Sequence, residues 1–257
     1  MGRRSSDHGP ERPAARDDTA RPAPGTSRLH HFEDIYSDDH EPWSFSERGV
    51  ETLRHERLTN LVSSLAPRRL LDLGCSLGQM TARLATLPTD VFAMDVSPTA
   101  VHRARERLRE MGAVSPPRFV SGDVTQLPFR AQTFDVILAS DGLYSWQLEI
   151  EDRAIALRQI HHALVPGGHA VLTEHMRTDH FPVYVGEIRA SPLRVVRVMY
   201  FHDRPCYQFE SWLKAIRHWR VARAARRSVS LARVLCTVGR WFGPVASRHI
   251  CVIATRD

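Results

Sequence analysis

The segment RRLLDLGCSLGQMTARLA, residues 68–85, constrains the fold of this 257-residue chain more than any other. A short apolar run ends at Asp72, and apolar residues then recur at helical spacing as far as Pro88. This order predicts a strand, a tight loop and a helix. The loop carries Gly74 and Gly78, whereas a dinucleotide-binding loop has the pattern Gly-x-Gly-x-x-Gly. It is therefore either a degraded phosphate loop or an intact loop for another ligand.

The order of strand and helix repeats downstream. Apolar runs predict further strands at residues 91–95, 117–123, 134–140 and 169–175. Ser97 and Pro98 supply the cap and first turn of a helix that ends at Gly112, and another helix begins at Glu151. Continuous apolar strands that alternate with amphipathic helices form parallel sheets covered on both faces. The sequence therefore predicts a doubly wound α/β domain with a mostly parallel, seven-stranded sheet.

The two ends of the chain differ from this repeating part. Residues 1–27 lack hydrophobic periodicity and are predicted to form a disordered tail, so the domain is expected to span residues 28–257. A helix leading into Pro67 is expected ahead of the sheet. The carboxyl third is predicted to contain a helix over 207–218, a strand over 219–227, a helical insertion near 229–241 and a closing antiparallel strand over 248–256.

Composition narrows the class of protein. The chain has no apolar run of about 18 residues and no apolar segment behind Arg3-Arg4, so we expect a cytoplasmic protein with neither a membrane partner nor a secretory signal. The four cysteines form no Cys-x-x-Cys pair, and adjacent histidines on a helix diverge by about 100°, so no metal site is expected. The net charge of +6 comes from arginines spread along the chain, which argues against a nucleic-acid partner.

Polar residues end the predicted strands, where ligands bind in sheets of this kind. The carboxylates are Asp72, Asp95, Asp123 and Asp141, the last of them directly after Ser140. Four carboxylates in one crevice would repel a pyrophosphate, but they suit a ligand with an ammonium group, a sulfonium group and free ribose hydroxyls. The glycines let the loop turn tightly and approach the ligand closely. An intact loop for a cationic ligand without phosphate is therefore the better interpretation.

The motifs DLGCSLG, AMDVS, SGDV and LVPGG resemble those of class I S-adenosylmethionine-dependent methyltransferases over roughly residues 30–175. Within that class, EPW at 41–43 together with Glu51 and Arg54 is similar to the nodulation-protein S type of N-methyltransferase. Those enzymes methylate the free amine of a glucosamine end on a chitin-like oligosaccharide. The resemblance implies S-adenosylmethionine as cofactor and a small-molecule acceptor, an amino sugar or another specialised metabolite.

The resemblance also implies roles for individual residues. Asp95 would accept hydrogen bonds from the ribose hydroxyls, Asp123 would accept one from the adenine amino group, and Arg54 would meet the cofactor carboxylate. The full set of expected cofactor contacts is Asp72, Gly74, Cys75, Ser76, Gly78, Asp95, Val96, Asp123, Val124, Ser140, Trp43 and Arg54.

The acceptor side is expected in the segments that follow the strands ending at Ser140 and His175. We expect Tyr144 to orient the acceptor and His175, with Asp141 or Glu174 nearby, to accept its proton, because histidine titrates near neutral pH. A purely structural histidine is the alternative. Two other functions also stay open: an RNA or protein methyltransferase that uses the arginines, and a catalytically silent cofactor-binding scaffold. The sequence leaves the oligomeric state open.

Overall fold

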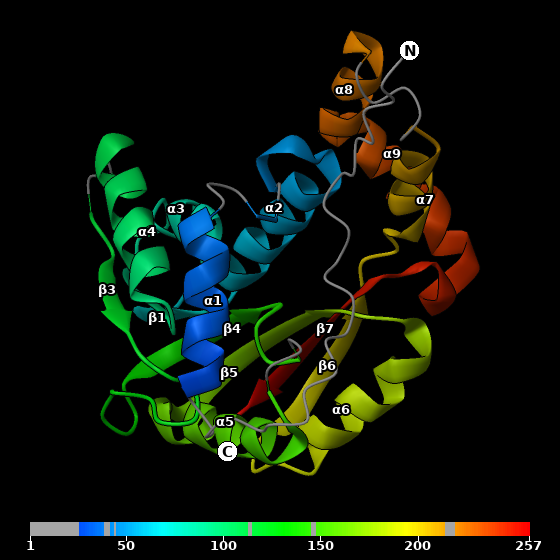
Figure 1. The fold of residues 1–257 in the computed structure, drawn as a ribbon. Coiled ribbons are helices and arrows are strands. Elements are labelled where there is room, and N and C mark those ends of the chain that lie inside the picture. The colour runs from blue at the N-terminus through cyan, green and yellow to red at the C-terminus, as the bar shows by residue number, and fades with distance from the viewer. Residues whose placement is uncertain (1–25, 39–41, 44, 113–114, 145–147, 214–218) are drawn as a thin grey trace.

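The computed structural model describes residues 26–38, 42–43, 45–112, 115–144, 148–213 and 219–257. Its centre is a seven-stranded sheet in the order β3-β2-β1-β4-β5-β7-β6 (Figure 1). The strands are β1 Arg69–Leu73, β2 Asp90–Asp95, β3 Arg118–Ser121, β4 Phe134–Ser140, β5 Leu164–His175, β6 Arg194–Tyr200 and β7 His249–Thr255. Strands β1 to β5 pair in parallel, and β7 runs antiparallel to both of its neighbours. The predicted fold class, with its antiparallel carboxyl-terminal strand, is confirmed.

Helices cover both faces of the sheet. They are α1 Thr26–Asp38, α2 Gly49–Ser64, α3 Gln79–Leu84, α4 Pro98–Glu110, α5 Ile150–Ala163, α6 Phe181–Arg189, α7 Arg204–Trp212, α8 Arg220–Arg227 and α9 Val229–Gly239. The short 3₁₀ segments are η1 Phe45–Glu47, η2 Thr178–His180 and η4 Arg240–Ala246. In Figure 1, α5 and α6 lie below the sheet, and α2, α3 and α4 lie above it.

The alternation of side chains along each strand explains this double cover. Leu70 packs with α2 and α3, whereas its neighbour Leu71 packs with α5 and α6, because successive side chains of a strand point to opposite faces. The helix predicted after Ser97 is also confirmed. The Ser97 side chain accepts a hydrogen bond from the Ala100 N–H at 3.0 Å, which satisfies one of the free donors at the start of α4.

The carboxyl third corrects one prediction. Residues 219–227 do not form a strand, because α8 occupies Arg220–Arg227. Alanine and arginine favour a helix, and the missing strand is β6, in which Val195, Val196 and Val198 provide the β-branched residues that strands prefer. The predicted helical insertion and closing strand correspond to α9 and β7.

The predicted amino-terminal tail lies mostly outside the part of the chain that the structure describes. Residues 1–25 of the predicted tail lie outside the described residues, and Thr26 and Ser27 already belong to α1. The division into a tail and one domain therefore stays a prediction. Within the part of the chain that the structure describes, none of the helices is long and apolar enough to cross a membrane.

Candidate cofactor and acceptor site

The glycine loop between β1 and α3 is tied to the end of β2. The N–H groups of Gly74 and Cys75 both donate to the Met94 carbonyl, at 2.8 and 2.9 Å. Gly74 has a φ of +79°, and a Cβ on it would meet only the Gly142 Cα, at 3.9 Å. This glycine therefore faces the space between the loops that follow β1 and β4, at the carboxyl edge of the parallel strands.

Gly78 ends the loop with a different contact. Its φ is +77°, and an added Cβ would lie 3.0 Å from both Ala104 Cβ and Leu108 Cδ1 of α4. The missing side chain thus lets the start of α3 approach α4 closely. A contact of Gly78 with the cofactor stays a prediction.

Two predicted acids are buried beside the loop. Asp72 accepts a hydrogen bond from Thr81 Oγ1 at 2.5 Å, yet burial raises the pKa of Asp72 to about 7. Asp95 accepts from the N–H of Ser76 at 2.8 Å and from that of Ser97 at 3.0 Å, one on each carboxylate oxygen. Burial also raises the pKa of Asp95, against the lowering effect of these bonds. A carboxylate has about four acceptor positions, and the Val96 N–H also donates to Asp95, so at least one position is left among the described residues.

The other predicted loop residues surround these acids. Cys75 is buried, and burial raises the pKa of its thiol well above the ordinary value, so it is a packing residue rather than a thiolate nucleophile. Val96 links Asp95 to the Ser97 cap and is half-buried. After β3, Asp123 Oδ1 accepts from the Thr125 N–H at 2.8 Å and its hydroxyl at 2.7 Å, and Val124 packs against the core.

Helix α1 crosses this region and supplies residues that sequence reasoning missed. Arg28 is buried and forms ion pairs with Asp123 at 3.5 Å and Asp152 at 2.8 Å. The Tyr36 hydroxyl donates to Ser76 Oγ at 2.9 Å. Only the helical spacing of Phe32 and Tyr36, which pack together over the loop, could have indicated this role.

Two further contacts complete the cover over the loop. The Trp43 indole N–H donates to the Tyr36 hydroxyl at 3.4 Å. This predicted cofactor contact therefore lies beside the loop, although Trp43 is 40% exposed. Glu33 accepts from the Thr99 N–H at 3.1 Å and from the Ser97 hydroxyl. Helix α1 is thus bonded to the start of α4.

A buried ion-pair network lies at the end of β4. Arg54 of α2 contacts Glu51 through Nε at 3.0 Å and through its terminal nitrogen at 2.9 Å. Its other terminal nitrogen lies 3.0 Å from Ser140 Oγ and 2.8 Å from Asp141 Oδ2. The structure therefore brings together the predicted Arg54, Ser140 and Asp141, but it directs the guanidinium to protein partners. Contact with a cofactor carboxylate stays a prediction.

Histidine and tyrosine side chains extend the network toward β7. The His249 Nδ1 donates to Asp203 Oδ2 at 2.5 Å, and its Nε2 lies 3.8 Å from Asp141 Oδ2. Burial alone would lower the pKa of His249, but Asp203 and Asp141 outweigh burial and raise it. The Tyr207 hydroxyl donates to Glu51 at 2.5 Å. Of these residues Glu51 and Asp141 are predicted from the sequence, whereas His249, Asp203 and Tyr207 follow no recognisable local pattern.

The predicted proton acceptor borders this network. The ring of His175 lies 4.8 Å from that of His249 and 5.6 Å from that of Tyr207, between centroids. Desolvation and then the charge of His249 lower the pKa of His175 to about 4. The neighbouring Glu174 is buried, and burial followed by the charge of Asp141 raises its pKa well above the ordinary value. A histidine with a lowered pKa thus stands beside a histidine and a carboxyl group whose pKa values are both raised.

Tyr144 has different surroundings. Its N–H donates to Glu174 at 3.0 Å, while its ring lies under the Arg153 guanidinium at 4.1 Å and against the Tyr184 ring at 4.9 Å. The ring contacts are therefore with α5 and α6 rather than with His175. The role of Tyr144 toward an acceptor stays a prediction.

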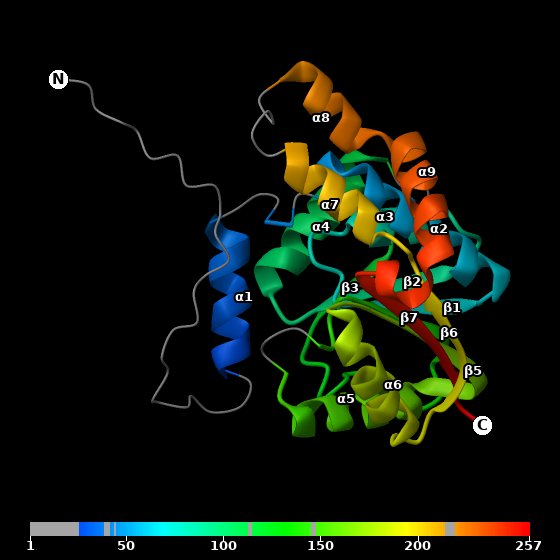
Figure 2. The ribbon, with the colours of Figure 1, turned by 90° about the vertical axis from the view of Figure 1, so that its right-hand side faces the viewer.

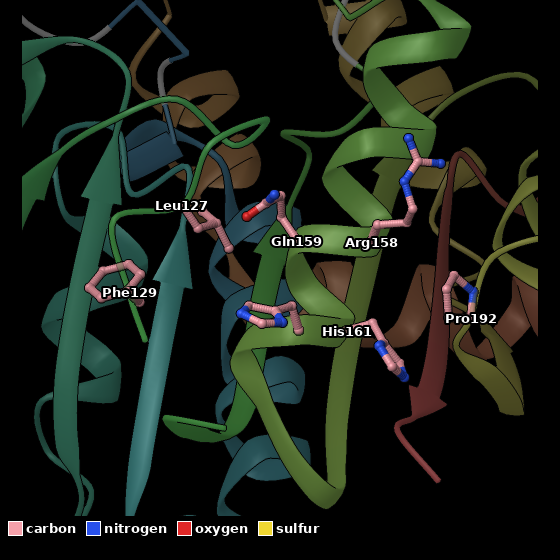
Figure 3. Close-up of a pocket in the computed structure, with 7 residues that line it drawn as sticks. Leu127, Phe129, Arg158, Gln159, His161 and Pro192 are labelled. Carbon is pink, nitrogen blue, oxygen red and sulfur yellow. The ribbon is translucent and has the colours of Figure 1, made fainter. Parts of the chain in front are cut away.

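A separate pocket of about 540 Å³ opens near the end of α5 (Figure 3). It is lined by Leu127, Phe129, Arg158, Gln159, His161, His162 and Pro192. The His162 carbonyl accepts from the Gln132 N–H, just before β4 begins, so the pocket lies at the amino ends of the strands. In Figure 3 the Arg158 and His161 side chains point in different directions. The pocket shares no residue with the predicted site at the carboxyl ends of the strands.

Known proteins share this loop and fold. Residues 70–168 match the family model of the methyltransferase domain. Nodulation protein S of Sinorhizobium fredii is 30% identical over 135 residues, which cover 51% of this chain and 59% of that protein. The chain thus matches less than two thirds of this curated relative's length.

Two solved structures extend the likeness to the fold. The [4+2]-cyclase SpnF is 25% identical with a TM-score of 0.55, over 78% of this chain and 81% of that one. The N-methyltransferase NodS from Bradyrhizobium japonicum WM9, solved with S-adenosyl-L-homocysteine, has a TM-score of 0.57 at 23% identity, over 67% and 89% of the two chains.

These matches confirm the predicted resemblance to S-adenosylmethionine-dependent methyltransferases, with nodulation protein S among the relatives. The family match begins inside β1 and ends inside β5, so it contains the glycine loop, Asp95, Asp123 and Asp141. Residues 70–168 of this chain therefore match the methyltransferase domain family.

Proposed function

We propose that this chain is an S-adenosylmethionine-dependent methyltransferase that N-methylates a small molecule, an amino sugar or another amine-bearing specialised metabolite. The observation that carries the proposal is the open face of Gly74 toward Gly142, flanked by the buried Asp72 and Asp95. A glycine backbone and carboxylates suit a cofactor that has an ammonium group, a sulfonium group and ribose hydroxyls, and that lacks phosphate.

The residues around the loop fit such a cofactor. Asp95 keeps at least one acceptor position for a ribose hydroxyl among the described residues. The hydrogen bonds of Asp123 with Arg28 and Thr125 all use Oδ1, which leaves Oδ2 for an adenine amino group. Asp72, two residues before Gly74, would lie beside the methionine portion of the cofactor. When bound, the cofactor supplies a methyl group on a positively charged sulfur.

The charges on the acceptor side favour an amine. Arg48, Arg54 and a protonated His249 are the cations of the network, and Glu51, Asp141, Asp203 and Glu210 are its anions. Burial would raise the pKa values of Glu51 and Asp203, but Arg54 and His249 respectively outweigh burial and lower them, so both acids are ionised. The network thus has one negative charge in excess, which attracts a protonated amine.

His175 provides a place for the amine proton. With a pKa of about 4 its imidazole is neutral at neutral pH but a weaker base than an ordinary histidine, so it would accept the proton only transiently and pass it on to water. Positioning of the acceptor can supply much of the remaining rate enhancement. In this proposal His175 removes the proton, and Asp141, between Arg54 and His249, orients the ammonium group.

The test compares two acids at opposite ends of β2. We expect Asp95→Asn to weaken S-adenosylmethionine binding at least tenfold in calorimetry, while Asp90→Asn leaves it unchanged because Asp90 lies half-exposed at the other end of the strand. The wild-type protein should then transfer labelled methyl groups to amines in a panel that includes glucosamine oligosaccharides. No cofactor binding at millimolar concentration would overturn the enzyme proposal, and binding with methylation of oxygen or carbon alone would overturn N-methylation.

The similarity to SpnF favours one second candidate, a cyclase that keeps the fold without transferring a methyl group. Mass spectrometry separates the two functions, because a cyclase leaves the mass of its substrate unchanged whereas a methyltransferase adds a methyl group. Consumption of an acceptor without transfer of label would select the cyclase.

A further inference from the structure

The segment of residues 219–248 holds an unusual concentration of positive charge. It contains seven arginines and no aspartate, glutamate or lysine, in a chain whose net charge is +6. Arg227 and Arg233 form exposed ion pairs with Glu47 and Glu56 at 3.3 Å. Arg220, Arg223 and Arg240 are exposed. Arginines occur along the whole chain, but acidic residues balance them elsewhere, so the excess of positive charge lies on residues 219–248.

Large apolar side chains are exposed on the same segment. Val234 and Val238 lie on α9, and Trp241 is the second residue after its end. The three have the i, i+4 and i+7 spacing of one helix face, and all are exposed. Trp241 is 82% exposed, and Phe242 is 63% exposed. Val245 is also exposed, as are Trp212, Trp219 and Val221 at the adjoining ends of α7 and α8. Exposed apolar residues in such a group mark an interaction surface.

The opposite side of α9 is fixed to the protein. Cys206 of α7 and Ala232 and Cys236 of α9 are buried in one cluster with Val50 and Leu53 of α2. Packing at the junction of α8 and α9 is close, because a Cβ on Gly49 would lie 2.6 Å from the Ser228 backbone. Figure 2 shows α8 and α9 at the periphery, on the other side of the molecule from α5 and α6. Val234, Val238 and Trp241 are thus exposed on the side of α9 that faces away from α2 and α7.

The combination of arginine and apolar side chains indicates which kind of partner this surface would bind. A second copy of the chain would bring two strongly positive surfaces together, which is electrostatically unfavourable. RNA would attract the arginines and stack on the aromatic rings, but it would offer nothing to Val234 and Val238. An anionic lipid bilayer offers both phosphates for arginine and an apolar interior for valine, tryptophan and phenylalanine.

We propose that α8, α9 and η4 dock this protein on the surface of an anionic phospholipid bilayer. Arg223 and Arg240 contact the headgroups while Trp241 and Phe242 enter the interface. This contact lies on the surface and does not span the membrane, and it departs from the sequence-based expectation of no membrane partner. The inference is independent of the proposed methyl transfer. It would place a bilayer beside α2 and α7, which supply Arg54 and Tyr207 to the acceptor side.

The test uses the full chain with vesicles of phosphatidylcholine, alone or mixed with phosphatidylglycerol. We expect co-sedimentation with the mixed vesicles at least ten times stronger than with phosphatidylcholine alone, and weaker at high salt. The double variant Trp241→Ser with Phe242→Ser should lose at least tenfold in binding, as should Arg223→Gln with Arg240→Gln. Circular dichroism and the Tm show whether each variant is folded.

Matched controls carry the same changes elsewhere. Met111→Ser with Val183→Ser removes exposed apolar side chains from α4 and α6, and Arg105→Gln with Arg109→Gln removes exposed arginines from α4. Both should bind vesicles like the wild type. Equal loss in the controls, or equal binding to the two vesicle types, would overturn the proposal. So would a dimer in size-exclusion chromatography that depends on Val234, Val238 and Trp241, or binding to RNA but not to vesicles.

Discussion

Arg54 of α2 and Asp141, directly after β4, form an ion pair at 2.8 Å in which the arginine is 2% exposed. Asp141 adopts a φ of +59°, a conformation that costs a non-glycine residue roughly 1–2 kcal/mol. Its N–H donates to the Thr173 carbonyl at 2.9 Å, which holds the turn. The strained backbone of Asp141 thus holds its carboxylate between Arg54 and His249 at a cost in conformational energy.

Removal of the arginine charge should destabilise the protein strongly. Arg54→Met removes the nearest cation from the buried Glu51 and the partly buried Asp141, and we expect the free energy of unfolding to fall by about 3 kcal/mol or more. Urea denaturation measures the change. Arg233→Gln, which breaks an exposed pair with Glu56, should cost less than about 1 kcal/mol. Equal losses in the two variants would contradict a buried network.

The open face of Gly74 predicts a specific loss of cofactor binding. Gly74→Ala should weaken S-adenosylmethionine binding at least tenfold in calorimetry, because its methyl group would project toward Gly142, where the cofactor is proposed to bind. Gly167→Ala is the matched control, since Gly167 has a similar φ of +75° and open space around it but lies in β5 away from the loop. Both variants should lose about 1 kcal/mol of stability. Similar cofactor affinity in the two variants would contradict the site.

Asp72 should make stability fall as the pH rises. Its pKa is about 7 in the folded protein and about 3.8 in its ordinary state, so between these values the folded state binds more protons than the unfolded state. The stabilisation is complete below about pH 4 and is lost as pH increases to about 7. Over this range the wild type should lose up to about 4 kcal/mol relative to Asp72→Asn. Urea titrations at several pH values measure the difference, and parallel curves would exclude the shift.

The pKa of His249 should be shifted in the opposite direction from that of His175. The pKa of His249 is raised in the folded state, so its stabilisation is present below about pH 6.5 and is lost as the pH rises through the folded value. Asp203→Asn should lower the pKa of His249, as followed by NMR of the imidazole resonances. His175, whose pKa is about 4, should stay neutral through the same range. An unchanged His249 titration in Asp203→Asn would show that Asp203 does not hold its proton.

The local part of the site could be predicted from the sequence. The glycine loop, Asp72, Asp95 and the Ser97 cap depend on residues close together in the chain, whose spacing follows from strand and helix geometry. The same reasoning failed at residues 219–227, because arginine and alanine next to a tryptophan and a valine do not distinguish a strand from an exposed amphipathic helix. There the position of β6 at the sheet edge, beside β7, decided the outcome.

Only the tertiary structure decided the acceptor side. Arg54, Asp141, Asp203 and His249 come from α2, β7 and the segments after β4 and β6, and no spacing rule connects them. Their contacts depend on the order of strands in the sheet, which places the start of the antiparallel β7 beside the end of β5. The sequence by itself thus determined a glycine loop with a row of acids at the strand ends, since both follow local periodicity. Packing across the sheet determined which distant charges meet, because burial energy and strand order depend on the whole fold.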